Sequence, residues 1–168
     1  MIKSILFVFV ALFPACLFCQ EIKSNEVDPF TNERTIETTF IPIKQGLTSG
    51  FGISYIAVNK NYYLNLIGYG NEATAIKNED KLWFVLDDGS VVQFNDRAEV
   101  EYQDSETKNV YIHHYFAHLN DIETLKNKHI SLVRIASSDN VLTDFKMSKK
   151  SSKALMKLND IFFKEVNK

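Results

Sequence analysis

The sequence predicts an α+β fold, in which a curved antiparallel sheet or partly closed β-barrel carries one short helix and a C-terminal amphipathic helix. Two observations indicate this. Short segments rich in β-branched and aromatic residues follow one another from residue 35 to residue 118, separated by turn formers, which favours antiparallel pairing. After residue 148 the apolar residues recur at three- and four-residue steps, which is typical of a helix packed on one side.

Residues 1–19 have the features of a secretory signal peptide. A single positive charge at Lys3 precedes an apolar run over residues 5–13, which Pro14 ends. The run is shorter than the about 20 apolar residues that a membrane span needs. We therefore expect an exported protein, either periplasmic or secreted.

Both cysteines, Cys16 and Cys19, lie in this leader. Cleavage after Cys19 leaves a chain that begins at Gln20 and has no thiol, which excludes disulfides, cysteine-ligated zinc and a cysteine nucleophile from the mature protein. Acylation of Cys16 is the alternative, and it would anchor the protein to a membrane.

The rest of the chain has the length of one domain. We expect residues 20–34 to be an extended polar lead-in and residues 35–168 to be a single β-rich globular domain. The formal net charge is −2 and becomes −3 when Lys3 is removed with the leader. A mildly acidic domain lacks the basic surface of a nucleic-acid-binding protein, so we expect no nucleic-acid partner.

Turn chemistry divides the β-rich part into strands. Asp-Gly at residues 88–89, between two apolar runs, is the strongest hairpin signal. The glycines of residues 46–52 indicate a turn with positive φ. The expected strands are residues 35–43 (ending near Pro42), 53–58, 62–67, 81–86, 91–94, 97–102 and 110–118.

Helix signals follow. Asn120 with Glu123 reads as the start of a short helix that ends near Lys128. Strands are expected at residues 129–137 and 141–146. Ser148 then caps the last helix, whose apolar face holds Leu155, Leu158, Phe162 and Val166.

Two features suggest ligand binding. Tyrosines alternate along the hairpin of residues 53–67, so Tyr55 and Tyr63 are candidate ligand-binding residues in a groove, with packing at the core edge as the alternative. Arg134 stands inside an apolar strand. Facing inward, it needs a negative partner such as an acidic ligand; facing outward, it is an exposed surface residue.

The histidines are weak candidates for metal or acid–base chemistry. His114 and His118 share one face of a strand but lie about 13 Å apart along it, so we expect neither a metal nor another cofactor. His113 and His114, with Glu99 and Glu101, are the residues that a small hydrolase-like enzyme would use.

No motif selects a catalytic residue. The chain has no Gly-x-Ser-x-Gly elbow, so neither Ser49 nor Ser54 is marked as a nucleophile. We therefore expect no catalytic site and lean toward a protein that is not an enzyme.

Lysines gather on the polar face of the last helix. They could meet anionic headgroups at a membrane surface or an acidic partner, and a solvated helix face is the alternative. The lysines concerned are Lys149, Lys150, Lys153 and Lys157.

Three stretches, at residues 28–31, 81–90 and 132–135, together with the leader, resemble small exported proteins of unknown function from Gram-negative bacteria. The resemblance covers most of the mature chain and implies a periplasmic or envelope address, with no catalytic residue to transfer. We expect a non-enzymatic envelope protein that binds a protein or small molecule through its curved sheet. The alternatives are a hydrolase-like enzyme and a membrane-apposed accessory protein.

Overall fold

The computed structural model describes residues 21–70, 79–94, 97–105, 108–137 and 142–168, with the backbone alone at 79–80, 97–105, 108–109 and 137. The signal peptide expected at residues 1–19, its cleavage site and the acylation alternative at Cys16 all lie outside the described residues.

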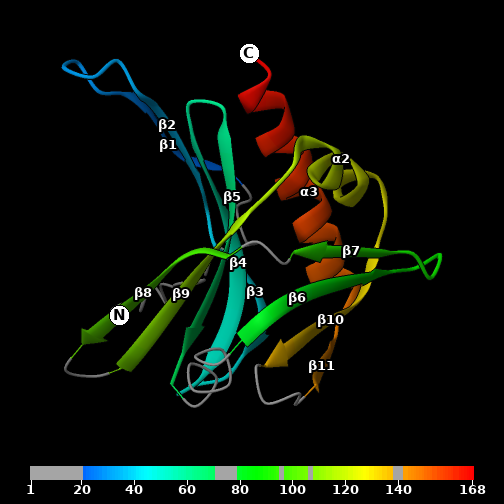
Figure 1. Ribbon diagram of the computed structural model, residues 1–168. Helices are drawn as coiled ribbons and strands as arrows, with labels where there is room; N and C mark the ends of the chain where they lie inside the picture. Colours follow the sequence, from blue (N-terminus) through cyan, green and yellow to red (C-terminus); the bar gives the residue numbers. More distant parts are fainter. Residues whose placement is uncertain (1–20, 71–78, 95–96, 106–107, 138–141) are drawn as a thin grey trace, which may run out of the picture.

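The larger of two sheets is antiparallel throughout and strongly curved (Figure 1). It consists of β1 (Ile22–Val27), β2 (Arg34–Thr38), β3 (Ile41–Gln45), β4 (Gly50–Val58), β5 (Asn61–Tyr69), β8 (Arg97–Ser105) and β9 (Lys108–Phe116). The strand order is β1-β2-β4-β5-β9-β8, and β3 also pairs with β4.

The smaller sheet has the order β11-β10-β6-β7. The predicted Asp-Gly hairpin is confirmed: Gly89 has a φ of +83°, and Asp88 Oδ1 accepts a 3.0 Å hydrogen bond from the backbone N–H of Ser90. The strands of this sheet are β6 (Glu79–Leu86), β7 (Val91–Phe94), β10 (Ile130–Ser137) and β11 (Leu142–Lys146).

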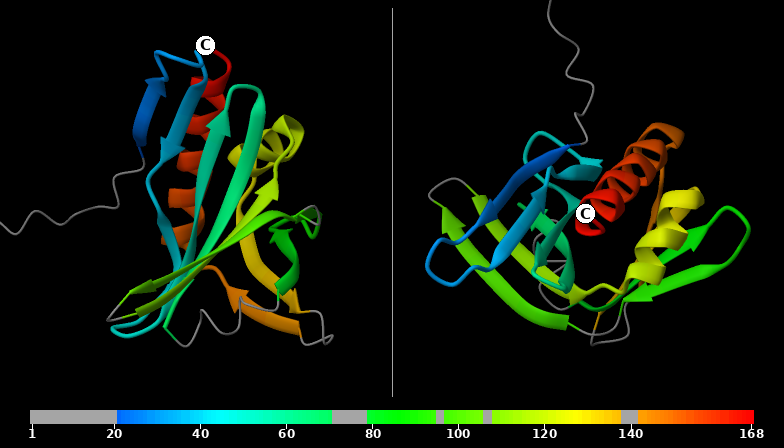
Figure 2. Two further views of the ribbon diagram at one scale, coloured as in Figure 1. Left: turned by 60° about the vertical axis from the view of Figure 1, so that its left-hand side comes forward. Right: turned by 90° about the horizontal axis from the view of Figure 1, so that it is seen from above.

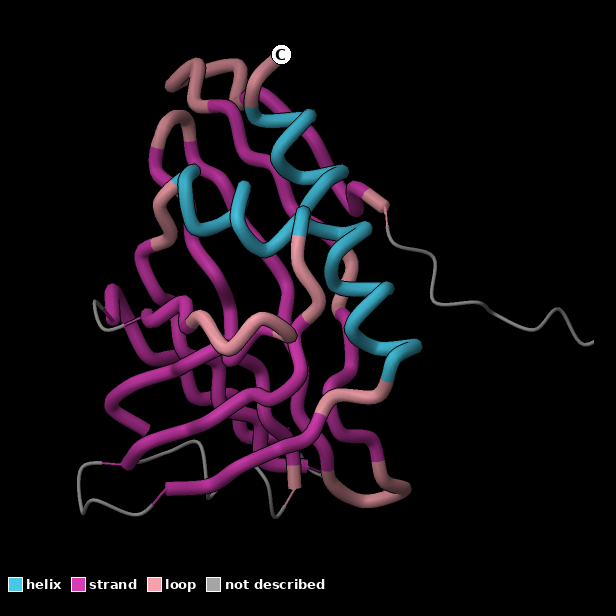
Figure 3. The backbone as a smooth tube through the Cα atoms, turned by 90° about the vertical axis from the view of Figure 1, so that its right-hand side faces the viewer, coloured by secondary structure: helices cyan, strands magenta, loops and turns pink. Residues whose placement is uncertain are grey.

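Two described helices, α2 (Leu119–Asn127) and α3 (Lys149–Val166), lie on the concave side of the larger sheet, which wraps around α3 (Figures 2 and 3). Ser148 caps α3 as predicted, because its Oγ accepts from the backbone N–H of Ser151 at 3.0 Å. The cap predicted at Asn120 is wrong: α2 begins at Leu119, and His118 holds the cap position without a side-chain bond.

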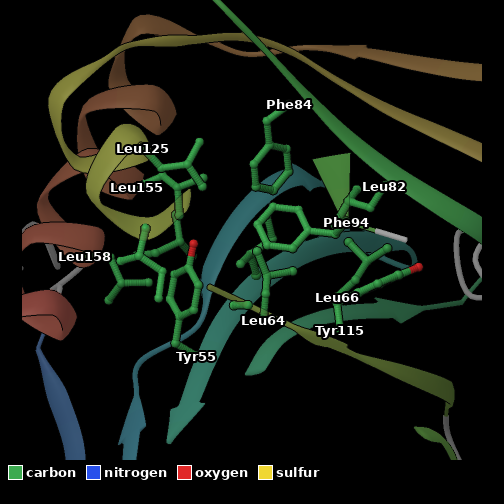
Figure 4. Close-up of a cluster of buried hydrophobic side chains, with 14 of the residues drawn as sticks. Tyr55, Leu64, Leu66, Leu82, Phe84, Phe94, Tyr115, Leu125, Leu155 and Leu158 are labelled. Atoms are coloured by element: carbon green, nitrogen blue, oxygen red, sulfur yellow. The ribbon is translucent and has the colours of Figure 1, made fainter. Parts of the chain in front are cut away.

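The hydrophobic core fills the space between the two sheets and the two helices. Along β4 the odd-numbered residues from Phe51 to Ala57 are buried there, as the period of two requires. Figure 4 shows the buried side chains of the larger sheet meeting those of the smaller sheet and of the helices: Tyr55, Leu64, Leu66 and Tyr115 with Leu82, Phe84, Phe94, Leu125, Leu155 and Leu158.

The predicted fold class is therefore confirmed: the protein is α+β, with curved antiparallel sheets that do not close, a short helix and a C-terminal amphipathic helix. One difference lies at the N-terminal side. The lead-in expected over residues 20–34 contains β1, which pairs with β2 from Ile22↔Thr38 to Val27↔Arg34 and extends the sheet. Backbone pairing to a neighbouring strand, which composition does not reveal, makes this polar segment a strand.

The strand expected over residues 35–43 is divided into β2 and β3. At the break, Thr38 Oγ1 accepts the backbone N–H of Tyr55 at 2.8 Å, in place of a ladder carbonyl. The glycines expected in a positive-φ turn are also placed differently, since Gly50 and Gly52 belong to β4. A Cβ at Gly52 would lie 2.3 Å from the carbonyl oxygen of Ile41, so close strand contact explains this glycine.

Candidate functional site

The two tyrosines predicted to bind a ligand lie on opposite faces of the larger sheet. Tyr55 is fully buried, and its ring stacks on Phe162 of α3 with centroids 5.0 Å apart. Burial, and secondarily the charge of Asp121, raise the pKa of the Tyr55 hydroxyl far above its usual range. Tyr63 stands on the convex face, 5.2 Å from the ring of Phe116. The two tyrosines therefore share no groove.

Arg134 faces outward, which is the second of the two alternatives considered from the sequence. It forms a two-bond pair with Asp144 on the neighbouring strand β11, with Nε–Oδ1 at 2.6 Å and Nη2–Oδ2 at 2.7 Å. Its guanidinium also lies 6.0 Å from the ring of Trp83. The hydrogen bonds from Arg134 lower the pKa of the Asp144 carboxyl.

The neighbouring histidines His113 and His114 face opposite sides of β9, as strand geometry requires. His113 is fully buried in the core. His114 Nδ1 donates to Asn65 Oδ1 at 2.7 Å, and Asn65 Nδ2 donates to Ser54 Oγ at 3.3 Å. Ser54, Asn65 and His114 thus form a polar row across β4, β5 and β9.

This row does not have the geometry of a nucleophile and its base. Asn65 lies between Ser54 and His114 in the strand register, so His114 is hydrogen-bonded to an amide and not to the hydroxyl of Ser54. Glu99 pairs with His114 in the backbone register of β8 and β9, and Glu101 pairs with Ile112. The side chains of both glutamates lie outside the described part of the chain.

The two histidines considered as metal ligands, His114 and His118, have different surroundings. His118 is exposed at the start of α2, whereas His114 belongs to the polar row. Within the described residues, no group of three or more histidine, cysteine, aspartate or glutamate side chains converges on a metal position.

A pocket of about 550 Å³ lies where α3 begins, beside the start of β10 and the end of β6; we name it the α3 pocket. Its lining combines lysine, histidine and hydroxyl groups with apolar side chains. The lining residues are Asp87, His129, Ile130, Ser131, Met147, Lys149, Ser152 and Lys153.

Hydrogen bonds fix the floor of the α3 pocket. Ser152 is only 3% exposed, and its Oγ accepts from the backbone N–H of Ile130 at 3.0 Å and lies 3.2 Å from His129 Nδ1. The backbone N–H of Met147 donates to the Ser131 carbonyl at 2.9 Å. These bonds tie the first turn of α3 to β10, so the pocket is held by regular elements on both sides.

The rim of the α3 pocket is positively charged. Lys149 and Lys153 are exposed, and neither forms an ion pair with an acidic side chain of the described residues. The first turn of α3 carries no acidic residue. Asp87 is the acidic group among the lining residues, against the two lysines. The pocket therefore favours a ligand with a negative group and an apolar part.

Only part of this pocket could be predicted from the sequence. Lys149 and Lys153 are recognisable there as surface lysines, whereas no spacing connects His129 or Met147 to them. Ser152 carries one usable signal, because it lies three residues before Leu155 on the apolar stripe of the helix. A small hydroxyl at such a position indicates a buried hydrogen bond.

Comparisons of the chain with protein-family models, curated proteins and solved structures found no match. Among the described residues, neither helix has the length and apolar character that a membrane crossing requires.

Proposed function

We propose that this is an exported, non-enzymatic binding protein of the cell envelope that holds a small anionic molecule in the α3 pocket. The observation that carries the proposal is the combination, in one pocket, of the two unpaired lysines Lys149 and Lys153 with the partly exposed apolar side chain of Met147. The preferred ligand is a carboxylate, sulfonate or phosphate joined to a compact apolar group.

The size of the α3 pocket supports this proposal. A volume of about 550 Å³ lies inside the range of roughly 300–1,000 Å³ that is usual for small-molecule sites. Because the Ser152–Ile130 and Met147–Ser131 bonds fix the backbone around the pocket, little backbone conformational entropy is lost when a ligand enters.

A ligand on the curved sheet is expected from the sequence, but the concave side of the larger sheet is filled. This favours the α3 pocket as the binding site. The proposed ligand does not lie in the curve of the sheet, because α3 occupies it and Phe162 covers Tyr55. We keep the binding role expected from the sequence and propose that the ligand site lies at the edge where α3 meets the smaller sheet.

The test uses two fluorescent probes that differ in charge. 1-Anilinonaphthalene-8-sulfonate carries a sulfonate on an apolar ring system, and N-phenyl-1-naphthylamine lacks the sulfonate. We expect the anionic probe to bind more tightly, and added salt to weaken its binding. In Lys149→Gln/Lys153→Gln its affinity falls roughly tenfold or more, whereas the affinity of the neutral probe stays the same.

The matched control is Lys157→Gln/Lys164→Gln, which removes the same charge from the same helix further from the pocket. It should leave the binding of both probes unchanged. An equal loss of affinity in both double variants means that net charge alone attracts the anion, and this outcome contradicts the proposal.

The membrane-apposed role remains a second hypothesis. It rests on the four exposed lysines of α3 that the sequence singled out, which are Lys149, Lys150, Lys153 and Lys157. Flotation with anionic vesicles separates the two roles, because membrane binding requires all the exposed lysines of the helix, including Lys157, and the pocket role does not.

A further inference from the structure

The turn that joins β1 and β2 is an ordered hairpin tip. Asp28 Oδ1 accepts the backbone N–H of Phe30 at 2.7 Å and of Thr31 at 2.9 Å. The backbone N–H of Asp28 donates to the Glu33 carbonyl at 2.9 Å, and that of Asn32 donates to the Asp28 carbonyl at 2.8 Å. We name residues 26–33 the hairpin tip. Its conformation is fixed without contacts from the core.

This rigid tip presents an apolar side chain among acidic ones. Phe30 is 92% exposed and Val27 is 58% exposed. Glu26, Asp28 and Glu33 surround them in the sequence, and all three are exposed. The backbone hydrogen bonds from Thr31 and Phe30 lower the pKa of the Asp28 carboxyl, which keeps it charged. An exposed aromatic ring on a preformed turn is a suitable anchor for a binding partner.

The α3 pocket is complementary to the hairpin tip in each of these respects. Its lining includes the partly exposed apolar side chain of Met147, which suits Phe30, and the lysines Lys149 and Lys153, which suit the carboxylates. Its volume of about 550 Å³ leaves ample room for a phenyl ring.

We infer that the hairpin tip of one copy of this chain docks in the α3 pocket of a second copy, with Phe30 as the apolar anchor. The inference rests on the proposed function of the pocket. A copy does not fill its own pocket, because the β1–β2 turn and the first turn of α3 lie on opposite sides of the molecule (Figures 1 and 2). The contact is head-to-tail, so it builds a chain of copies unless the rotation closes a ring.

Sedimentation velocity of the purified protein tests the inference, with three variants. The weight-average mass of the wild type should rise at least twofold with concentration. Phe30→Ser should remain monomeric. So should the tip variant Glu26→Lys/Glu33→Lys and the pocket variant Lys149→Glu/Lys153→Glu, since each places like charges at both sides of the contact.

Mixing the two charge-reversed variants makes the test specific. In an equimolar mixture each acidic tip meets a basic pocket and each basic tip meets an acidic pocket, so association should return. The same mixture with Phe30→Ser in both partners should stay monomeric. Association that persists without Phe30 would reveal general attraction between opposite charges and would overturn the inference.

Probe binding separates this inference from the function on which it rests. Phe30→Ser leaves the pocket intact, so it should bind 1-anilinonaphthalene-8-sulfonate at least as well as the wild type. A wild type that is monomeric at every concentration, yet binds the probe through Lys149 and Lys153, overturns the docking inference alone. A wild type with neither association nor lysine-dependent probe binding overturns both.

Discussion

The ring of Phe162 on α3 stacks on the ring of Tyr55 on β4, with centroids 5.0 Å apart and planes 20° from parallel. Both side chains are fully buried. This contact fills the concave side of the larger sheet and holds α3 in place. The first turn of α3 also lines the α3 pocket, so the packing of this one helix supports both the core and the candidate site.

Replacing Phe162 with alanine should lower the free energy of unfolding by about 3–5 kcal/mol, because the substitution leaves a cavity at the stacked contact. Urea denaturation measures the change. Phe163→Ala is the matched control, since Phe163 is only partly buried and contacts Lys126 at the surface. Equal losses in the two variants would show that the stacked ring has no special part in holding α3.

Replacing Ser152 with alanine should cost about 1–3 kcal/mol, because the buried backbone N–H of Ile130 loses its acceptor. The amide of Ile130 should also exchange its hydrogen faster than in the wild type. Ser151→Ala serves as the control, as its side chain bonds Ser148 and not β10. Unchanged exchange at Ile130 in Ser152→Ala would mean that the pocket floor is held by other contacts.

Replacing Asn159 with leucine should stabilise the protein by about 1–3 kcal/mol. Asn159 is fully buried in α3, and neither atom of its amide group has a hydrogen-bond partner among the described residues. Leucine has a similar branched shape without the cost of an unsatisfied polar group. Thermal unfolding measures the gain. A destabilised variant would show that the amide is satisfied in solution, for example by a buried water.

The pair of Arg134 and Asp144 should make stability depend on acid pH. The folded-state pKa of Asp144 is lowered from 3.8, so its stabilising effect is complete at pH values above 3.8. The effect is lost as the pH falls from 3.8 through the lower folded-state pKa. In Asp144→Asn this part of the acid dependence should disappear. Urea midpoints across the acid range, measured for both proteins, check it, and identical slopes would contradict the assignment.

Some local signals in the sequence predicted the local structure correctly, although the cap expected at Asn120 was wrong. Gly89 in the Asp-Gly turn and Ser148 as a helix cap each act through neighbouring residues, and both are confirmed. The apolar stripe of α3 is confirmed at Leu155, Leu158 and Phe162, which are fully buried. Periodicity was enough to predict the buried residues of α3, because this helix has one dominant apolar face.

What depends on distant contacts could not be predicted. Thr38 ends β2 because its hydroxyl bonds Tyr55, which lies 17 residues further along the chain. The α3 pocket joins residues from the end of β6, the start of β10 and the start of α3. The lysines of the rim were visible in the sequence, but only the packing of α3 against β10 places Ile130 and Met147 beside them.

The most direct measurement of the central claim is an NMR titration of the isotope-labelled protein with 1-anilinonaphthalene-8-sulfonate. We predict that the largest amide shifts map to residues 129–131 and 147–153, around the α3 pocket. A second pocket of about 440 Å³ lies beside the turn between β4 and β5, lined by residues that include Lys60 and Phe116. Shifts centred there, or spread over the convex face without a maximum at α3, would contradict the account.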